Sequence, residues 1–451
     1  MASTVDIPKL LVANRGEIAV RIFRACYDLG IHTVAIYSNE DANSLFRTKA
    51  DEAYLVGEKK SPLGAYLDIP GIIGLARRRG VKAIHPGYGF LSENAEFARA
   101  CEENDILFVG PSSDVLEKMG DKLSAKAIAI DCGVPIIPGC TEPLKGAEEA
   151  VEMANRFGYP VILKAAAGGG GRGMRRCDTD EEVRTAYELV HNEAEKSFGC
   201  GDIFMEKFLV NPKHIEVQIL ADKHGNVYHL GERDCSLQRR YQKVVEYAPA
   251  WSVPKATIDA LRADAVRIAK SVGYVSAGTV EFLVDQSGSY YFIEMNPRIQ
   301  VEHTVTEMVT GIDIVEWQIR TAAGIPLPFT QEQIGRGRHA IECRICAEHG
   351  TDCLPATGSV TMLHVPGGVD VRFDTALYAG CEVTPYYDSL LGKLVVCADT
   401  RDAAIRKMKC ALSEFVLVGV ENNRETHMKF MENGSFLSGL YDTGLVGRVL
   451  R

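Results

Sequence analysis

Residues 278–307, GTVEFLVDQSGSYYFIEMNPRIQVEHTVTE, concentrate carboxylates and other polar side chains in one short stretch. TVEFLVD and YYFIEMN have strand-like compositions, and the turn-rich QSGS between them predicts a hairpin with a four-residue loop. If Asp285 faces Tyr290, Glu281 lies directly opposite Glu294, where like charges repel each other. We therefore expect a cation between these two glutamates.

Asn296 shares a face with Glu294, because alternate residues of a strand point to the same side. Two carboxylates and an amide oxygen suit Mg²⁺ carrying nucleotide phosphates, although two solvated surface glutamates are the simpler explanation. After Pro297, the planar guanidinium group of an arginine suits a small planar oxyanion, and a nearby carboxylate could accept the proton of that oxyanion. The residues available for this chemistry are Arg298, Gln300, Glu302 and His303.

A second candidate site is the glycine-rich stretch KAAAGGGGRGM at residues 164–174, which Lys164 and Arg172 flank with positive charge. A flexible surface linker is one explanation. A polyphosphate site is the other, because bare amides can point at phosphate oxygens while cations neutralise them. The strand-like YPVILK (159–164) just before it favours the phosphate site. No Gly-Lys-Ser/Thr follows, so this is not a Walker A loop.

Two further polar stretches allow an anion or nucleotide site. ERDCSLQRRYQKVVEYAP (232–249) carries Arg239, Arg240 and Lys243 without helical amphipathicity, which favours an anion site over a solvated face. FMEKFLVNPKHIEVQIL (204–220) predicts a strand followed by a linker whose backbone could read an adenine edge. His214 in this stretch could touch a sugar or phosphate, although a lone histidine is more often structural.

The first third of the chain alternates short apolar runs with amphipathic stretches, the pattern of a doubly wound parallel sheet. KLLVAN (9–14) predicts a strand, and the next residues predict a helix that ends at Gly30. HTVAIYS, KAIHPG and ILFVGP predict further strands. NRGE (14–17) and HPGYGF (85–90) follow strands, where such sheets place ligands, although plain turns explain them equally well. New units begin near residues 119 and 335.

Composition limits the functional classes. With 451 residues, 46% hydrophobic and 24% charged, the chain predicts a soluble protein of two to four domains. The net charge of −10 argues against a general nucleic-acid binder. Neither a secretory signal nor an uninterrupted apolar membrane span is present, so we expect a cytoplasmic protein without membrane partners.

The 13 cysteines are an odd number, which fits reduced thiols better than a disulfide framework. Cys343, Cys346 and Cys353 look like half of a zinc site. They lack a matching second pair, and in the extended run HAIECRICAE the first two should face opposite ways. We therefore expect no metal there.

Several long segments together resemble biotin carboxylase, the ATP-grasp component of the biotin-dependent carboxylases. They are GDKLSAK, KAAAGGGGRGM, MEKFLVNPKHIEVQ, ERDCSLQRRYQKVVE, EMNPRIQVEHTVTEM, ECRICAE and VTPYYDSLLGKL, and the similarity runs from about residue 8 to near the C-terminus. The resemblance implies an α/β fold, α+β in part. We expect a Rossmann-like domain at 1–117, an ATP-grasp domain at 118–328 and a C-terminal mixed domain at 335–445. It also implies a mobile lid at about 135–205, with Gly168 to Gly173 closing over the phosphates.

Matched position by position, the resemblance implies three sets of site residues. Around ATP it places Lys122, Lys164, Gly170, Gly171, Glu206, Lys207, Phe208, Leu209, His214, Gln238, Tyr241, Glu281 and Glu294. As ligands of Mg²⁺ or Mn²⁺ it places Glu281, Glu294 and Asn296. Around bicarbonate and biotin it places Lys243, Arg298, Gln300, the backbone of Val301, Glu302 and Arg344.

The resemblance also implies a reaction. Glu302 removes the proton of bicarbonate, which attacks the γ-phosphate of ATP to give carboxyphosphate and ADP. Arg344 then stabilises the biotin enolate that takes up CO₂. Lys243, Arg298, Glu302 and Arg344 are the catalytic residues in this scheme. Positioning and electrostatics are expected to supply most of the acceleration.

Details of the sequence bear on the parent complex. Tyr241 stands where bacterial subunits of the family carry histidine, and Pro297 with ADEAYLVGE and AYLDI resembles the pyruvate carboxylase branch. The length favours instead a subunit of acetyl-CoA carboxylase or another acyl-CoA carboxylase. Because no Ala-Met-Lys-Met motif is present, we expect biotin on another polypeptide, or on a longer chain from which this domain comes. The expected partners are a biotin carboxyl carrier protein or domain, a carboxyltransferase component and a second copy of the chain.

Two other functional classes stay open on the residues alone. An ATP-grasp ligase that joins a carboxylate to an amine would keep Glu281, Glu294 and Lys164. It has no need for Arg298, Glu302 and Arg344 together. A non-catalytic regulator would bind MgATP without turning it over.

Overall fold

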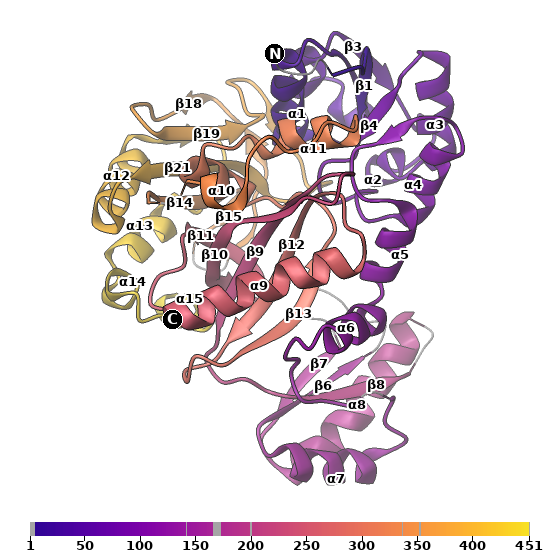
Figure 1. The fold of residues 1–451 in the computed structure, drawn as a ribbon. Coiled ribbons are helices and arrows are strands. Elements are labelled where there is room, and N and C mark those ends of the chain that lie inside the picture. Colours follow the sequence, from indigo (N-terminus) through magenta and orange to yellow (C-terminus); the bar gives the residue numbers. More distant parts are fainter. Residues whose placement is uncertain are drawn as a thin grey trace.

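The structure, a computed structural model, describes residues 5–140, 142–165, 173–198, 201–335, 337–350 and 353–450. The N-terminal part is a parallel sheet with strand order β3-β2-β1-β4-β5 (Figure 1). Leu10 packs in the core that includes α1, and Leu11 packs with α3 and α4. Helices thus cover both faces, which confirms the doubly wound sheet. The elements are β1 (Lys9–Val12), α1 (Gly16–Asp28), β2 (His32–Tyr37), β3 (Glu52–Leu55), α2 (Pro62–Tyr66), α3 (Ile69–Arg78), β4 (Ala83–His85), α4 (Ala95–Glu102), β5 (Leu107–Phe108) and α5 (Ser113–Gly120), with 3-10 turns at Asn39–Asp41 and Leu45–Lys49.

The two stretches predicted at strand exits pack against each other. The side-chain amide of Asn14, after β1, donates to the carbonyl oxygens of Pro86 at 2.7 Å and Tyr88 at 2.8 Å, after β4. Gly87 between them has a φ of +65°, and a Cβ there would lie 2.8 Å from the Asn14 amide nitrogen. Only glycine fits this close approach without strain.

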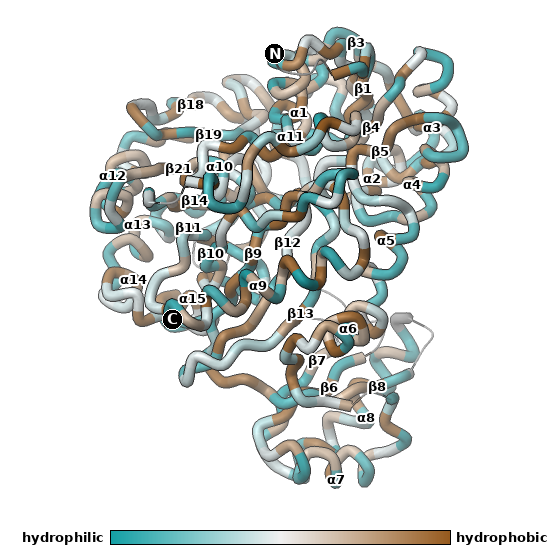
Figure 2. Tube along the Cα trace, in the orientation of Figure 1, coloured by the Kyte–Doolittle hydropathy of each residue, from teal (hydrophilic) through white to brown (hydrophobic). Residues whose placement is uncertain are grey.

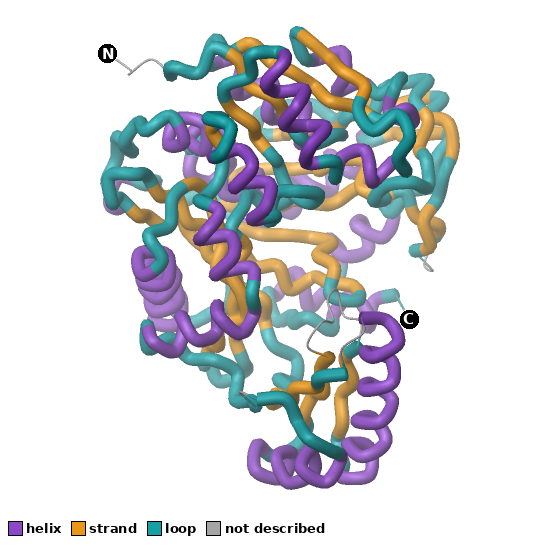
Figure 3. The backbone as a smooth tube through the Cα atoms, turned by 90° about the vertical axis from the view of Figure 1, so that its right-hand side faces the viewer, coloured by secondary structure: helices purple, strands orange, loops and turns teal. Residues whose placement is uncertain are grey.

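A small α/β unit stands at the lower end of the molecule in both backbone views (Figures 1 and 3). Its antiparallel sheet has the order β7-β6-β8, with Lys164 opposite Met174. The glycine-rich stretch therefore joins two paired strands, and its residues 166–172, including Gly170 and Gly171, lie outside the described residues. The elements of this unit are α7 (Ala147–Phe157), β6 (Val161–Ala165), β7 (Met174–Cys177), α8 (Asp180–Phe198) and β8 (Ile203–Lys207). Helix α6 (Lys122–Asp131), which comes before them in the chain, packs Ala125 and Ala129 into the core of the central sheet.

An antiparallel sheet lies at the centre of the molecule, and its strands come from both the middle and the C-terminal part of the chain. Its strand order is β13-β12-β9-β10-β11-β14-β21-β19. Pairing of β11 with β14 joins the middle of the chain to its C-terminal part in one continuous sheet. The elements of this region are β9 (Lys213–Ala221), β10 (Val227–Arg239), β11 (Gln242–Ala248), α9 (Lys255–Ser271), β12 (Ser276–Val284), β13 (Tyr290–Asn296), α10 (His303–Thr310), α11 (Ile314–Ala322), β14 (His339–Cys346), β19 (Val371–Thr375) and β21 (Leu390–Ala398).

Strand β9 shows why this sheet has one apolar and one polar face. Ile215, Val217 and Ile219 pack into the core formed with α9, whereas His214 and Glu216 alternate with them and face the other side. Figure 2 traces this mixture of hydrophobic and hydrophilic residues along the central strands. Helix α10 contacts β10, β11, β14 and β21, and so helps to bury the polar face.

The β12–β13 hairpin confirms the facing glutamates but corrects the register that predicted them. Val284, not Asp285, lies opposite Tyr290, and Asp285 begins the turn by donating its backbone N–H to Ser289 at 2.8 Å. A bulge between the Phe282 and Glu281 pairs then shifts the register by one residue. Glu281 therefore still lies opposite Glu294, because the bulge compensates for the shorter pairing near the turn.

Short strands and helices complete the C-terminal part. They are the 3-10 turn Gln331–Gln333, β15 (Glu348–His349), β16 (Leu354–Pro355), β17 (Gly358–Ser359), β18 (Met362–His364), β20 (Glu382–Val383), α12 (Arg401–Glu414), β22 (Val416–Val418), α13 (Arg424–Glu432), α14 (Gly434–Ser438) and α15 (Leu445–Val449). Among the described residues, none of the helices combines the length and apolar character that a membrane crossing requires.

Candidate active site

The polar face of the central sheet carries a row of charged residues, one from each of four neighbouring strands. Glu294 of β13 lies opposite Glu281 of β12, which lies opposite Glu216 of β9, which in turn lies opposite Arg233 of β10. Glu281 is 6% exposed, while Glu216 and Arg233 are fully buried. Neighbouring carboxylates that are both buried and ionised need cations, so this row requires positive partners.

Lys243 of β11 is one such partner. Its ammonium group contacts Glu216, and it lies 2.9 Å from Oε1 of Glu281 and 2.6 Å from Oε1 of Glu302. Lys243 reaches this position through a bulge, because its strand skips Val244 in pairing with β10. Burial alone would raise the pKa of Glu302, but Lys243 and then the nearby guanidinium groups outweigh burial and hold that pKa well below its usual value. Glu302 is thus a buried carboxylate that stays ionised at neutral pH.

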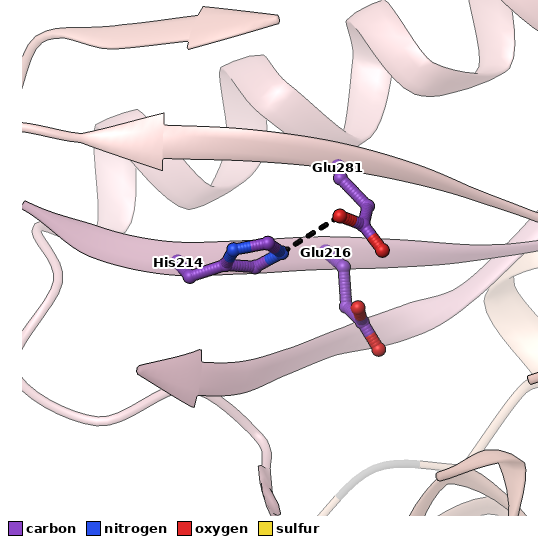
Figure 4. A group of neighbouring side chains, drawn as sticks. All are labelled: His214, Glu216 and Glu281. Carbon is purple, nitrogen blue, oxygen red and sulfur yellow. Dashed lines mark ion pairs between the residues drawn. The ribbon is translucent and has the colours of Figure 1, made fainter. Parts of the chain in front are cut away.

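Glu281 is surrounded by donors. Figure 4 shows His214 pointing at Glu281 with Glu216 beside them, and His214 Nε2 lies 3.0 Å from Glu281 Oε2. Ligand atoms of these three residues all lie within 4.8 Å of one another. Burial opposes ionisation of Glu281, but Lys243 and then His214 hold its pKa well below the usual value.

The hairpin acids fit a hard divalent cation in charge and in donor type. Glu281 is ionised and faces Glu294, and carboxylate oxygens are preferred ligands of Mg²⁺. Asn296 donates its amide N–H to Glu281 at 3.0 Å, while its oxygen accepts from Arg298 at 2.9 Å. The amide nitrogen of Asn296 therefore faces Glu281, while its oxygen faces Arg298 and keeps a second lone pair for a ligand.

Arg298 and Gln300 reach the same cluster from the loop after β13. Arg298 Nε lies 3.0 Å from a carboxylate oxygen of Glu93, which comes from the N-terminal part of the chain. Gln300 donates to Glu281 at 2.8 Å, and its own oxygen accepts from Arg233 at 2.7 Å. The predicted oxyanion-binding residues and the predicted metal ligands thus share one hydrogen-bonded cluster.

Arg233 fixes this loop and α10 on the sheet. Its guanidinium lies 2.5 Å from Glu216 and also donates to Thr306 of α10 at 2.9 Å. Further bonds go to Gln218 at 2.7 Å and Thr279 at 3.2 Å. Removal of one partner from such a fully buried charge network is costly, so these elements are held rigidly together.

Arg344 of β14 links Glu302 to a second buried carboxylate. Its Nε donates to Glu246 at 2.5 Å, and its Nη2 donates to Glu302 at 2.9 Å. The backbone oxygen of Val301 accepts from the buried Lys393 at 3.1 Å. Lys243, Val301, Glu302 and Arg344, predicted from widely separated stretches, are therefore neighbours.

The predicted nucleotide residues divide between the sheet and the small α/β unit. Glu206 of β8 pairs with both Lys164 and Lys126. Lys207 points away from them and donates to the backbone oxygens of Gly158 at 2.7 Å and Tyr159 at 2.8 Å. Lys126 of α6 and Lys164 of β6 thus meet at one carboxylate of the small unit.

The remaining predicted nucleotide residues are more scattered. Phe208 stacks under Arg176 at 4.9 Å, and Leu209 lies in the linker to β9. Gln238 is buried and donates to the Cys235 backbone at 2.9 Å, whereas Tyr241 is 61% exposed in the β10–β11 turn. The side chain of Lys122 lies outside the described residues.

Several charged residues near the site were not predicted from the sequence. Glu216 lies two residues after His214 on a strand, so the alternation of HIEVQ could have revealed it. No sequence pattern indicated Glu93 or Lys393, because these residues approach the site only in the folded chain. The full set of missed residues is Glu93, Lys126, Glu216, Arg233, Glu246 and Lys393.

The cysteine-rich stretch contributes no cluster among the described residues. The groups of described residues that could hold a metal lie elsewhere, and are His214 with Glu216 and Glu281, and Glu216 with Cys235 and Glu302. Cys343 is fully buried, and its neighbour Cys346 is partly exposed, in keeping with opposite faces of one strand.

The fold and the site together define the ATP-grasp class of proteins, in which a small α/β unit and a larger acidic sheet enclose a nucleotide. The family model "Carbamoyl-phosphate synthase L chain, ATP binding domain" matches residues 121–330. The models "Biotin carboxylase, N-terminal domain" and "Biotin carboxylase C-terminal domain" match residues 6–116 and 342–448. The chain belongs to the biotin carboxylase family.

Individual relatives agree with this assignment. Biotin carboxylase 1 of Bacillus subtilis is 49% identical over 439 residues, which cover 97% of each chain. Mitochondrial pyruvate carboxylase of Rattus norvegicus is 49% identical over 445 residues, 98% of this chain but 38% of that longer protein. Among solved structures, the biotin carboxylase domain dimer of Hydrogenobacter thermophilus 2-oxoglutarate carboxylase, in complex with MgADP, ADP and bicarbonate, has a TM-score of 0.94, with 49% identity over 99% of each chain.

Proposed function

We propose that this protein carboxylates biotin with bicarbonate at the expense of MgATP, through carboxyphosphate. The observation that carries the proposal is the position of Glu302, an ionised carboxylate held between Lys243 and Arg344 beside Glu281. A ligase that couples a carboxylate to an amine has no need for a buried base between two cations. The residue roles below are part of the same proposal.

Bicarbonate occupies the space bounded by Lys243, Arg298 and Gln300, with its negative charge neutralised by the two cations. Glu302 accepts the bicarbonate proton, and the oxygen so freed forms a bond to the γ-phosphorus of ATP. ADP leaves as the bond between the γ-phosphorus and the bridging oxygen breaks. The products of this step are carboxyphosphate and ADP.

Carboxyphosphate then splits into CO₂ and inorganic phosphate as its carbon–oxygen bond breaks. The ureido N–H of biotin gives its proton to this phosphate, and Arg344 stabilises the resulting enolate, whose nitrogen forms the bond to CO₂. The guanidinium of Arg344 is partly exposed, so one edge can face a substrate while the Nε and Nη2 groups remain on Glu246 and Glu302. A planar arginine is suited to an enolate oxygen, because its N–H groups point in fixed directions.

The nucleotide is bound between the sheet and the glycine-rich hairpin. Lys164 supplies positive charge to the phosphates, as do Lys122 and the backbone of Gly170 and Gly171, and the segment 204–214 holds the adenosine. Glu281, Glu294 and Asn296 would hold Mg²⁺ or Mn²⁺, which when bound neutralises phosphate charge. These acids would hold the metal on the central sheet.

The biotin is carried by a separate carrier protein or domain, and a carboxyltransferase component receives the carboxyl group. A near-complete match to a free-standing biotin carboxylase supports a subunit of acetyl-CoA carboxylase or another acyl-CoA carboxylase. The alternative is a pyruvate carboxylase, whose relatives this chain matches over 38% of their length. We further propose a homodimer in the cytoplasm.

One assay separates the proposed function from its rivals. ADP release is measured with and without bicarbonate, and with and without free biotin. A biotin carboxylase requires bicarbonate and is stimulated by biotin. Turnover that ignores both compounds would exclude the proposal in favour of another ligase, and binding of MgATP without turnover would indicate a regulator.

A further inference from the structure

Two glutamates outside the roles given above lie side by side in the core of the central sheet. Glu246 of β11 is directly opposite Glu342 of β14, and both are fully buried. Opposed residues in an antiparallel pair have Cβ atoms roughly 5 Å apart. Two negative charges this close in a buried setting repel each other strongly, so at most one of the two carboxyl groups stays ionised.

Each glutamate has one hydrogen-bonded oxygen and one oxygen without a partner among the described residues. Glu246 accepts from Arg344 Nε at 2.5 Å, and Glu342 accepts from the Thr304 hydroxyl. The second oxygens, Oε2 of Glu246 and Oε1 of Glu342, are buried and make no hydrogen bond. A single proton on Glu342 would convert one of these two acceptors into a donor.

The nearby cations are already committed to other carboxylates. Arg344 is shared with Glu302, and Lys393 lies 3.1 Å from Glu17. Burial raises the pKa of Glu246 to about 7, even though Arg344 beside it acts in the opposite direction. Burial, and then the charge of Glu246, raise the pKa of Glu342 well above its usual value. The titratable and charged groups that face the pair are Tyr88, Cys235, Lys243, Glu302, Cys343, Arg344 and Lys393.

We propose that Glu246 and Glu342 share one proton, held by Glu342, and that they position Arg344 and the first turn of α10 for carboxylation. The role in carboxylation rests on the proposed function. Ionised Glu246 holds one side of the Arg344 guanidinium, which leaves the other side on Glu302. Glu342 holds Thr304, two residues after Glu302, so the pair sets the spacing between Arg344 and the base. Both are positioning residues, because neither needs to touch a substrate.

The isosteric variants Glu246→Gln and Glu342→Gln distinguish the two roles. A glutamine at 342 mimics a protonated carboxyl group, whereas a glutamine at 246 removes the charge that anchors Arg344. We expect Glu246→Gln to lower kcat/KM for free biotin about tenfold or more, because charge-assisted hydrogen bonds are the strong ones. The KM for ATP should stay within about twofold. The loss in Glu342→Gln should be at least about fivefold smaller.

The pH profile tests positioning against a merely structural role. Wild-type kcat/KM for biotin should fall as the pH drops below about 7, because protonation of Glu246 releases Arg344, and this acid limb should be missing in Glu246→Gln. Thermal unfolding of both variants checks that each is folded. Equal losses in the two variants, or a larger loss in Glu342→Gln, would overturn the assignment.

An infrared measurement reads the shared proton without any turnover. At about pH 8, wild-type protein should show the carbonyl stretch of a protonated carboxyl group, and the band should be absent from Glu342→Gln. If the band is unchanged in that variant, no proton resides on Glu342. Absence of any biotin-dependent turnover in the wild type would overturn the proposed function and the positioning role, while the infrared band would still decide on the proton.

Discussion

The ammonium group of Lys243 lies 2.6 Å from Oε1 of Glu302, and both side chains are almost entirely buried. The contact brings together the bulged start of β11 and the N-cap residue that immediately precedes α10. Because the pair is buried, its attraction is screened less than that of a surface pair. It keeps a carboxylate base ionised in a place where burial alone would protonate it.

Replacement of Glu302 by glutamine removes the base but keeps its shape. We expect bicarbonate-dependent ADP release to fall by about a hundredfold or more, the usual contribution of a positioned general base. The affinity for MgATP, measured by calorimetry, should change little. The matched control is Glu425→Gln, which alters an exposed glutamate 72% accessible on α13. Normal turnover in Glu302→Gln would remove this residue from its role as base.

The metal dependence of turnover can tell which acids hold the cation. If the hairpin acids are the ligands, Glu294→Gln should raise the Mg²⁺ concentration for half-maximal ADP release by about tenfold. Glu216→Gln should reduce turnover, because it breaks the contacts of Lys243 and Arg233, without moving that Mg²⁺ concentration. The opposite result would place the metal at the group formed by His214, Glu216 and Glu281.

Lys126, the last residue of the GDKLSAK segment, should influence ATP binding although it was not among the predicted nucleotide residues. Lys126 and Lys164 both pair with Glu206, so loss of Lys126 leaves Glu206 to hold Lys164 alone and makes Lys164 less available to phosphates. We expect Lys126→Met to raise the KM for ATP roughly fivefold with kcat nearly unchanged, a size typical of one partly exposed ion pair. Lys118→Met, on the exposed side of α5, is the control. An unaltered KM for ATP in Lys126→Met would show that Lys126 does not influence nucleotide binding.

The raised pKa of Glu246 predicts a specific pH dependence of stability. Its pKa of about 7 in the folded protein lies above the ordinary value of about 4.3, so the folded state binds more protons between these values. The contribution of Glu246 to stability must therefore decrease as the pH rises through this window. Relative to wild type, Glu246→Gln should gain a few degrees in the midpoint of thermal unfolding between about pH 5 and about pH 7.5. A constant difference across the window would contradict the raised pKa.

Arg15 should tie the N-terminal sheet to the C-terminal part of the chain. Its guanidinium makes two bonds of 2.7 Å to the buried Asp41 and lies 3.6 Å from the ring centre of Tyr387. We expect Arg15→Met to lower the free energy of unfolding by about 2 kcal/mol, less than for a fully buried pair because Arg15 is partly exposed. Urea denaturation measures the loss, and the double variant Arg15→Met/Asp41→Asn should regain part of it. No recovery in the double variant would show that the uncompensated charge of Asp41 is not the cause.

The hairpin illustrates both the reach and the limit of sequence reasoning. Alternation and turn composition predicted two strands and placed Glu281 opposite Glu294, which the structure confirms. The turn register was wrong by one residue, since a bulge is a local compromise between pairing and side-chain packing that no alternation pattern reveals. The correct pair emerged because the bulge compensated for that error.

The sequence by itself determined the parallel sheet at the N-terminus and the facing acids of the hairpin, because each depends on neighbours a few residues apart. The family could be recognised from the sequence for the same reason, because its motifs are short and continuous. Only the tertiary structure decided that Glu93 meets Arg298, that Lys126 shares Glu206 with Lys164, and that Glu246 faces Glu342. These contacts join residues remote in the chain, and burial and charge there depend on every strand and helix that packs around them.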